Sequence, residues 1–462
     1  MAKISRKSKH IFWHFGRQRI GLLCALGMEA ALLAGMSRFG DFSAPGTAGR
    51  FVGLAFAAGG AFWLAASRFS KLRDARQQAL FLWSGAVLLR LAILPIEPGD
   101  DLWRYLWEGR IQQHGFSPYA YAPDAPALAS LRALEPNWWR INHPSWSTIY
   151  PPATELVFFA VTSLGGGVYA FKLLFAAADL LSLHLLIRLL KQNRLPYRLA
   201  AFYGWNPLPI YCFAGAAHFD SLMLAATLGA VVCLFSSLPS PNNGSARPPG
   251  GNRAALLLST AFLGLAVSLK VVPMFYFPLW FFVLGRRFYL LGITLAVPLW
   301  FSVLYGYPSV DIFASLQKFA EVARTNELLL WVLERVVLPH STQSTHLYHL
   351  ITGAAVVAAS WVFRKEPLRA LLWVTGALLV FAPSLHAWYA TWILPFAVLQ
   401  KSRFWLGFSV SIFGYFLLWE STALWQAWES NLWLWLLQVT PPLVLWWFQP
   451  RSLPLTPLDQ TR

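Results

Sequence analysis

Apolar segments long enough to cross a membrane follow one another along nearly the whole chain. A helix needs about 17–25 mostly apolar residues to cross the hydrocarbon core of a bilayer. On this criterion about fourteen segments can be assigned: residues 20–36, 51–66, 79–96, 168–190, 199–217, 222–238, 254–269, 271–284, 288–305, 347–363, 368–382, 388–399, 404–418 and 432–448. We therefore expect an all-α, polytopic transmembrane helical bundle of about 12–14 spans with short extracytoplasmic interfacial helices.

The charge distribution agrees with a membrane protein. The chain is 57% hydrophobic and only 12% charged, whereas a soluble protein carries about a quarter charged residues. The net charge of +17 could suggest a nucleic-acid partner, but the basic residues form short clusters between apolar segments, at 3–19, 68–76, 188–198, 286–287, 364–369 and 401–403. This is the positive-inside pattern of cytoplasmic loops. We expect a lipid bilayer as partner, no nucleic acid, and a cytoplasmic N-terminus.

The basic clusters divide the chain into five regions. These are an N-terminal basic segment with three transmembrane helices (1–96), a first extracytoplasmic loop with interfacial helices (97–167), a central transmembrane module (168–305), a second extracytoplasmic loop (306–345) and the C-terminal transmembrane helices (346–462). The first loop is rich in Trp, Tyr and Pro, which suits a membrane interface. In it, residues 151–164 predict a surface or partly inserted helix, and residues 310–324 of the second loop predict an amphipathic one.

Two adjacent aspartates, Asp100 and Asp101, stand where the third apolar segment ends and the first loop begins. Carboxylates at the edge of a bilayer are costly and usually mark a functional site. The simpler interpretation is a solvated helix end. The functional one is a general base, because cations and aromatic rings follow directly, with Arg104 and Arg110 among them. Such a carboxylate can deprotonate a sugar hydroxyl while nearby cations hold a phosphate.

Further candidates lie at the ends of other segments. His143 and Tyr150 close the first loop beside prolines, which also suits a rigid turn. His218 and Asp220 are two residues apart and do not share a helical face, so we expect a helix terminus that presents both. Lys270 can snorkel or bind an anionic head group, and His386 can belong to an aromatic belt or donate to a phosphate. The orientation places Asp100, Asp101, His218, Asp220, Lys270 and His386 together at the outer face.

These motifs resemble a known enzyme class. The run from Asp100 to Arg110, Gly115-Phe116-Ser117-Pro118-Tyr119, Tyr150-Pro151-Pro152, Trp205-Asn206-Pro207, His218-Phe219-Asp220, Lys270-Val271-Val272-Pro273 and His386-Ala387-Trp388-Tyr389 with Leu394-Pro395 follow in this order. In this order they resemble the GT-C glycosyltransferases, and most closely the bacterial polyprenyl-phosphate-mannose-dependent mannosyltransferases (glycosyltransferase family 87). The mannosyltransferase that starts GPI-anchor assembly is more distantly similar. The family usually has Pro where this chain has Ala387.

The resemblance implies transfer of a hexose, which we expect to be mannose, from a polyprenyl-phosphate donor to a glycolipid or glycan acceptor, with inversion at the anomeric carbon. It implies a multi-pass protein of the bacterial cytoplasmic (inner) membrane with its active site facing the periplasm or exterior. The catalytic carboxylate of the family falls on Asp101, with Asp100 as the second candidate. Donor phosphate and sugar contacts fall on Arg104, Arg110, His143, Tyr150, His218, Asp220, Lys270 and His386. We expect no cofactor and no obligatory metal.

Two other classes remain open from the sequence. An O-antigen ligase or oligosaccharyltransferase would also act on lipid-linked glycans, but its chemistry is expected in a later loop than the aspartate pair. A transporter or flippase would require charges near the midplane and repeat symmetry; Glu29 and Asp179 are its support, and no long repeat is visible. A purely structural membrane subunit predicts that Asp101→Asn is silent.

Overall fold

The computed structural model describes residues 6–42, 44–237, 252–305, 311–327, 329, 344–420 and 432–448. Over these residues the chain is helical and has no strand; residues Thr325 and Ser384 form an isolated parallel bridge. The predicted all-α fold is confirmed.

The longer helices are α1 (Arg6–Met36), α2 (Thr47–Phe69), α3 (Ala75–Ile93), α4 (Asp101–Gln113), α6 (Pro152–Ser163), α7 (Val168–Gln192), α10 (Asp220–Ser237), α11 (Arg253–Leu269), α13 (Leu291–Tyr305), α16 (Ser344–Val362), α17 (Pro367–Val380) and α21 (Leu432–Trp447). Shorter helices are α5 (Ala129–Leu134), α8 (Ala201–Gly204), α9 (Pro207–Pro209), α12 (Phe277–Leu284), α14 (Ala314–Val322), α18 (Leu394–Leu399) and α19 (Arg403–Ser411). The expected helices near residues 151–164 and 310–324 correspond to α6 and α14.

Five helical stretches in the described part of the chain are long and apolar enough to cross a membrane: Gln18–Phe39, Thr47–Phe69, Val168–Gln192, Asp220–Ser237 and Val272–Tyr305. Five shorter apolar helices accompany them. The multi-pass bundle is therefore confirmed, but several expected spans are divided into short pieces. The clearest case is 199–217, in which α8 and α9 are followed by a π-helix at Ile210–Gly215. Proline removes the backbone donor that a continuous helix needs, which explains the break before Pro207.

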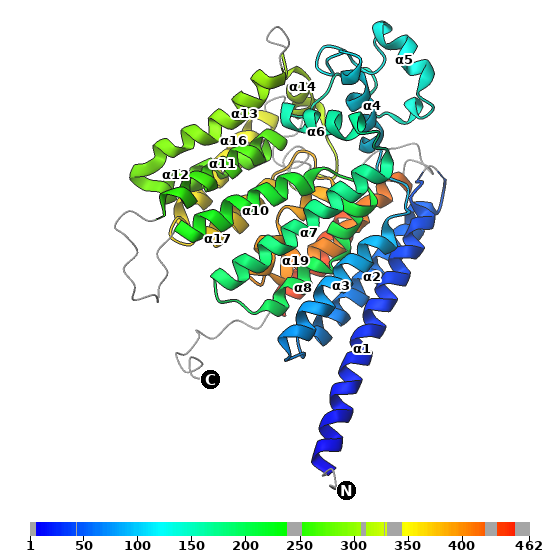
Figure 1. Ribbon diagram of the computed structural model, residues 1–462, viewed down its shortest axis with the longest axis vertical. Coiled ribbons are helices and arrows are strands. Elements are labelled where there is room, and N and C mark those ends of the chain that lie inside the picture. The colour runs from blue at the N-terminus through cyan, green and yellow to red at the C-terminus, as the bar shows by residue number, and fades with distance from the viewer. Residues whose placement is uncertain are drawn as a thin grey trace.

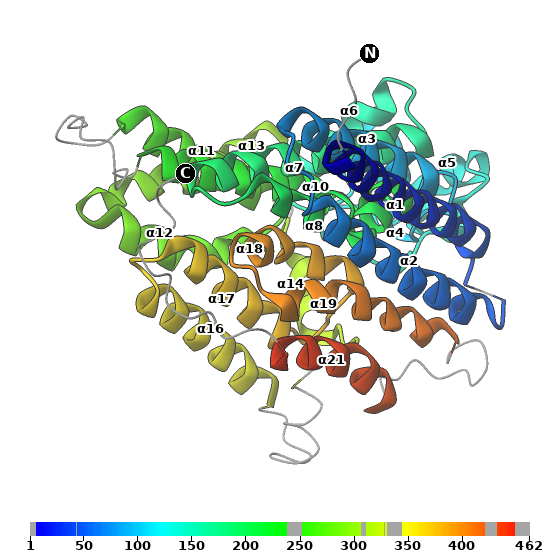
Figure 2. The ribbon, with the colours of Figure 1, turned by 90° about the horizontal axis from the view of Figure 1, so that it is seen from below.

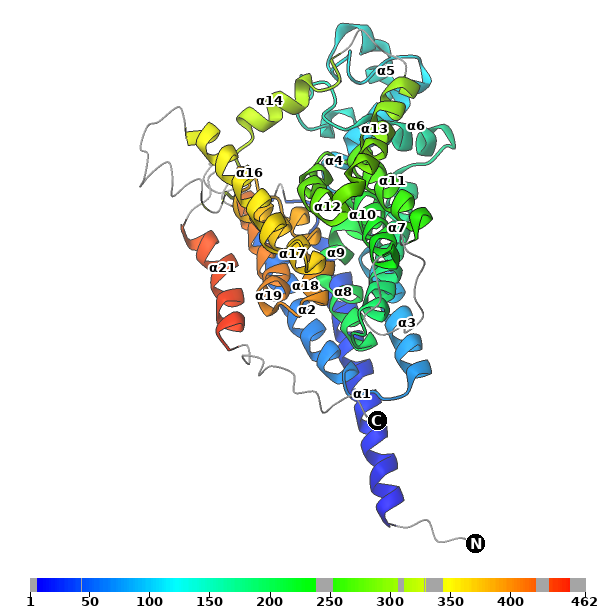
Figure 3. The same ribbon diagram turned by 90° about the vertical axis from the view of Figure 1, so that its left-hand side faces the viewer.

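The helices form a bundle with two sides. Helices α7, α10, α11 and α13 pack against one another on one side, and α16, α17 and α21 lie on the other (Figures 2 and 3). Helix α14 crosses between the two sides at the end that carries α4, α5 and α6 (Figure 3). The N-terminus lies at the opposite end of the molecule (Figure 1).

Charged side chains inside the bundle are paired across helices. Arg90 of α3 donates to Asp179 of α7 at 2.5 Å, and the Tyr203 hydroxyl donates to the same carboxylate at 2.6 Å. The Lys172 ammonium of α7 donates to the carbonyl of Leu94 at 2.8 Å. A buried charge must be compensated in this way to be tolerated, so these residues hold helices together.

Candidate active site

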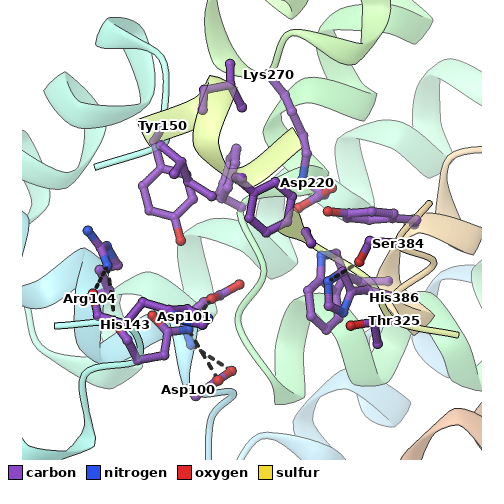
Figure 4. Close-up of a pocket in the computed structure, with 18 of the residues that line it drawn as sticks. Asp100, Asp101, Arg104, His143, Tyr150, Asp220, Lys270, Thr325, Ser384 and His386 are labelled. Carbon is purple, nitrogen blue, oxygen red and sulfur yellow. Dashed lines mark hydrogen bonds and ion pairs between the residues drawn. The ribbon is translucent and has the colours of Figure 1, made fainter. Parts of the chain in front are cut away.

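A cavity of about 710 Å³ lies where the first loop, the starts and ends of several helices, and α14 meet. Its walls come from Asp100, Asp101, Arg104, Asn142, His143, Trp146, Ile149, Tyr150 and Pro151 of the first loop, Phe219, Asp220, Lys270, Val271 and Val272 between helices, Leu316, Phe319, Val322, Ala323, Arg324 and Thr325 at α14, and Ser384, His386, Trp388, Tyr389, Tyr415 and Trp419 of the C-terminal part. Figure 4 shows the acidic pair across the cavity from His386 and Ser384. Segments far apart in sequence thus build one site.

The aspartate pair is held at the start of α4. Asp100 caps the helix, and its Oδ1 accepts from the backbone N–H of Asp101 at 3.1 Å. The Asn142 side-chain amide donates to Asp101 Oδ1 at 2.8 Å and to Asp100 Oδ2 at 3.2 Å. A helix N-terminus favours negative charge, so both the cap and the amide stabilise carboxylates here.

Asp100 is exposed and Asp101 is partly buried in the cavity wall, and the pKa values of the two carboxyl groups separate. Desolvation by the surrounding protein raises the pKa of Asp100, and the negative charge of Asp101 raises it further. Desolvation also acts to raise the pKa of Asp101, but the neighbouring His218 and the Asn142 amide outweigh it and lower that pKa to about 2. Two adjacent carboxylates share a site best when one is ionised and the other is easily protonated. Asp101 is therefore the ionised member of the pair.

His218 lies directly behind Asp101. Its Nδ1 is 3.6 Å from Asp101 Oδ2, longer than a hydrogen bond but close enough for electrostatic attraction. The imidazole stacks on Trp388 with ring centroids 3.9 Å apart. As expected, His218 and Asp220 flank a helix start, because α10 begins at Asp220.

The backbone beside the Asp101 contacts is strained. Ala217 precedes His218 with φ of 63°, and His143 follows Asn142 with φ of 43°. Residues other than glycine rarely adopt such left-handed conformations, which concentrate at functional sites. The fold therefore fixes Asn142 and His218, the two neighbours of the Asp101 carboxylate, at the cost of backbone strain beside each of them.

His386 lines the same cavity on the other face of Trp388, with ring centroids 4.4 Å apart. Its Nδ1 lies 2.8 Å from the Tyr415 hydroxyl, and its Nε2 lies 3.1 Å from the Ser384 hydroxyl. Burial lowers the pKa of His386 to about 3, so the ring is neutral at physiological pH and both nitrogens are engaged. It is a polar wall of the cavity, not a cation.

Lys270 supplies a cation at the end of α11. The backbone turns to an extended conformation at this residue, which ends the helix and directs the ammonium group to the cavity. Lys270 Nζ pairs with Asp220 Oδ1 at 2.7 Å, and the Trp392 indole donates to the same oxygen at 2.7 Å. The ammonium also lies 5.0 Å from the ring centre of Tyr389, within the range of a cation–π contact. The lysine is held in place but keeps N–H donors for a ligand.

Arg104 reaches the cavity wall with its donors already used. Its Nε donates to Glu108 at 2.7 Å, and its terminal nitrogens donate to the backbone carbonyls of Asn142 and His143, each at 3.2 Å, and of Trp146 at 2.5 Å. Four of the five possible donations are therefore made, and three of them organise the loop 142–146. The structure thus gives Arg104 a role in shaping the loop that the sequence did not indicate.

Eight of the ten predicted site residues line the cavity: Asp100, Asp101, Arg104, His143, Tyr150, Asp220, Lys270 and His386. His218 stands behind Asp101. The structure does not bring Arg110 to the cavity, because its guanidinium pairs with Glu135 on the outside of α4 and is nearly half exposed. Sequence reasoning did not select Asn142, Arg324 or Tyr415; for Arg324, its place at the end of the predicted amphipathic helix was the available signal.

Comparison with known proteins gives one family. A family model, MptA_B family, described as alpha-(1->6)-mannopyranosyltransferase, N-terminal domain, matches residues 22–286, more than half of the chain. The matched part includes Asp101, His218 and Lys270, whereas His386 lies beyond it. No curated protein and no solved structure matches the chain.

Proposed function

Because the chain belongs to the MptA_B family of alpha-(1->6)-mannopyranosyltransferases, we propose that it transfers mannose from a polyprenyl-phosphate donor to a glycolipid or glycan acceptor at the extracytoplasmic face of the membrane. Membership makes the protein a membrane-embedded glycosyltransferase that acts on mannose. The lipid-phosphate donor, the inverting course and the roles of individual residues are the proposed part.

The observation that carries the proposal is the ionised Asp101 carboxylate in a cavity with one polar and one apolar side. A base must be ionised at the operating pH and must reach the proton that it removes. With its pKa lowered to about 2, Asp101 meets the first condition, and its position in the cavity wall suits the second.

The proposed step is a direct displacement. The acceptor hydroxyl oxygen attacks the anomeric carbon of mannose, the bond from that carbon to the phosphate oxygen breaks, and Asp101 takes the hydroxyl proton. The polyprenyl phosphate leaves with the electron pair of the broken bond. Lys270, held by Asp220 at 2.7 Å, is placed to stabilise the negative charge on the phosphate. Tyr150 lines the cavity near the aspartates (Figure 4) and offers a phenol to sugar hydroxyls.

The apolar part of the wall fits a lipid-linked donor. Leu316, Phe319 and Val322 of α14 face the cavity at helical spacing, and Val271 and Val272 continue the apolar surface beside Lys270. A lipid phosphate presents a polar head next to a hydrocarbon chain, which matches a cation with apolar neighbours. A nucleotide-linked sugar has no hydrocarbon chain and would not require apolar side chains beside the cation.

The membrane orientation supports an extracytoplasmic site. The basic N-terminal cluster favours a cytoplasmic N-terminus, and the cavity elements α4, α6 and α14 lie at the opposite end of the molecule (Figure 1). The expectation that no obligatory metal takes part stays a prediction. Within the described residues no group of three His, Cys, Asp or Glu side chains forms a metal site.

A comparison of two mannose donors tests the proposal. Purified protein in liposomes is given polyprenyl-phosphate mannose or nucleotide-linked mannose, each radiolabelled, with a lipid extract as acceptor. We expect label to reach the acceptor from the lipid-linked donor alone. Transfer from the nucleotide sugar, with none from the lipid donor, would overturn the proposal.

A further inference from the structure

A second acidic pair lies behind the cavity wall, between α4 and α6, and no step above uses it. Glu108 is 1% exposed and Glu155 is 0% exposed, and neither lines the cavity. The Thr148 hydroxyl stands between them, 2.7 Å from Glu155 Oε1 and 3.2 Å from Glu108 Oε2. A hydroxyl has one proton and can donate to only one carboxylate at a time. The two acids are therefore a linked pair.

The charges around this pair balance only with one extra proton. The single guanidinium in contact is Arg104, which donates to Glu108 Oε1 at 2.7 Å. Gln112 donates a neutral amide hydrogen to Glu155 Oε2 at 3.0 Å. Two buried carboxylates against one cation would leave an uncompensated charge, which proteins avoid by taking up a proton. Burial raises the pKa of both acids, but Arg104 opposes this at Glu108, whereas the pKa of Glu155 is raised well above its usual range by burial and by the nearby Glu108. The proton therefore belongs on Glu155, the acid that has no cation in contact.

The other groups around Glu155 do not supply a second cation. Besides Arg104 and Glu108 of α4, the titratable groups that face it are Tyr119 and Tyr150 of the first loop. Tyr305, at the end of α13, packs on the Tyr119 ring with centroids 5.2 Å apart. From α11, the contact to α6 is the Leu269 carbonyl, which accepts from Thr154 at 2.6 Å. A neutral Glu155 therefore completes this cluster.

The pair is connected to Asp101 through Arg104. Glu108 fixes one side of the guanidinium, and the other side donates to the carbonyls of the loop 142–146. That loop carries Asn142, whose amide donates to Asp101 at 2.8 Å. The chain of contacts is continuous: it runs from Glu108 and Arg104 of α4 to the loop 142–146 and returns through Asn142 to Asp101 at the start of α4.

We infer that Glu108, ionised, and Glu155, protonated, form a proton-sharing pair that positions the Asp101 carboxylate through Arg104 and Asn142. They are positioning residues, since neither reaches the cavity. That the position of the Asp101 carboxylate matters for catalysis rests on the proposed function. That the acidic pair is connected to Asp101 rests on the hydrogen bonds alone.

Two isosteric variants separate the roles. Glu155→Gln copies the protonated acid and keeps a neutral side chain, so transfer at neutral pH should remain close to that of wild type. Glu108→Gln removes the charge that holds Arg104, so kcat should fall by about 10- to 100-fold, as expected for a misplaced catalytic group, with the donor KM little changed. Glu135→Gln, at the pair with Arg110 outside the cavity, is the matched control and should behave as wild type.

The pH profile provides a readout that a merely structural role would not move. The arrangement needs Glu155 protonated, and its raised pKa means that activity persists below this pKa and declines as pH rises through it. Glutamine cannot lose this proton, so Glu155→Gln should lack the alkaline decline seen in wild type. An unchanged alkaline limb in this variant, or equal losses in both Gln variants, would overturn the inference.

Hydrogen exchange distinguishes failure of the inferred positioning network from failure of the proposed function. Measured by mass spectrometry on the full-length protein, exchange in the 142–148 segment should quicken in Glu108→Gln and stay unchanged in Glu155→Gln and Glu135→Gln. If wild type transfers mannose from no polyprenyl-phosphate donor but this pattern holds, the proposed function fails and the positioning network stands. If Glu108→Gln leaves the exchange of this segment unaltered, the inference is refuted whatever the activity.

Discussion

Replacing Arg104 by lysine separates two roles for this residue, donor-phosphate binding and organisation of the first loop. Lysine keeps the positive charge, but a single ammonium cannot match the planar fork of arginine. It can retain the contact with Glu108 and must give up the contacts to the carbonyls of Asn142, His143 and Trp146. At about 1 kcal/mol for each of three lost hydrogen bonds, the loss is about 3 kcal/mol of folding stability in this region.

The assay follows thermal denaturation of purified protein in detergent together with the steady-state kinetics of mannose transfer. We expect Arg104→Lys to denature several degrees below wild type and to lose kcat, because Asn142 no longer holds Asp101. Arg110→Lys, at an exposed pair outside the cavity, is the control and should change neither quantity. An unchanged denaturation midpoint with a raised KM for the donor would refute the loop role and assign Arg104 to phosphate binding.

Two further predictions concern packing and pH. Gly109→Ala should destabilise the protein by about 1–3 kcal/mol, because the added Cβ would lie 2.5 Å from the Phe158 carbonyl of α6; Gly27→Ala, with open space around it, should not lower the denaturation midpoint. Since the Asp101 pKa is lowered to about 2, its carboxylate stays ionised until pH falls toward that value, so transfer between about pH 5 and pH 8 should show no acid limb from this residue. An acid limb in this range that shifts to another pH in Asp101→Glu would contradict the low pKa.

The sequence was sufficient to select most of the residues that line the candidate cavity, because these residues mark physical boundaries. Asp100 and Asp101 are carboxylates at the end of an apolar segment, and Lys270 is a cation between two such segments. The positive-inside pattern then gives these ends the same side of the membrane.

The sequence could not predict which groups each polar side chain contacts. Arg104 bonds to carbonyls 38 to 42 residues further along the chain, and backbone acceptors leave no mark in a sequence. Asn142 was overlooked for the same reason, since its significance lies in its distance from Asp101 and not in any motif. The number of full-length spans was also hard to predict, because apolar composition does not distinguish a continuous helix from short pieces such as α8 and α9.

The most direct test of Asp101 as the base compares label transfer from radiolabelled polyprenyl-phosphate mannose by wild type, Asp101→Asn and Asp100→Asn, in matched amounts of folded protein. Asparagine has the shape of aspartate but cannot accept the proton, so Asp101→Asn should lower transfer by about 10²- to 10⁴-fold. Asp100→Asn keeps the side-chain oxygen that accepts from the Asp101 backbone N–H, and it should retain most of the activity. Transfer by Asp101→Asn at the wild-type rate would contradict the proposed chemistry.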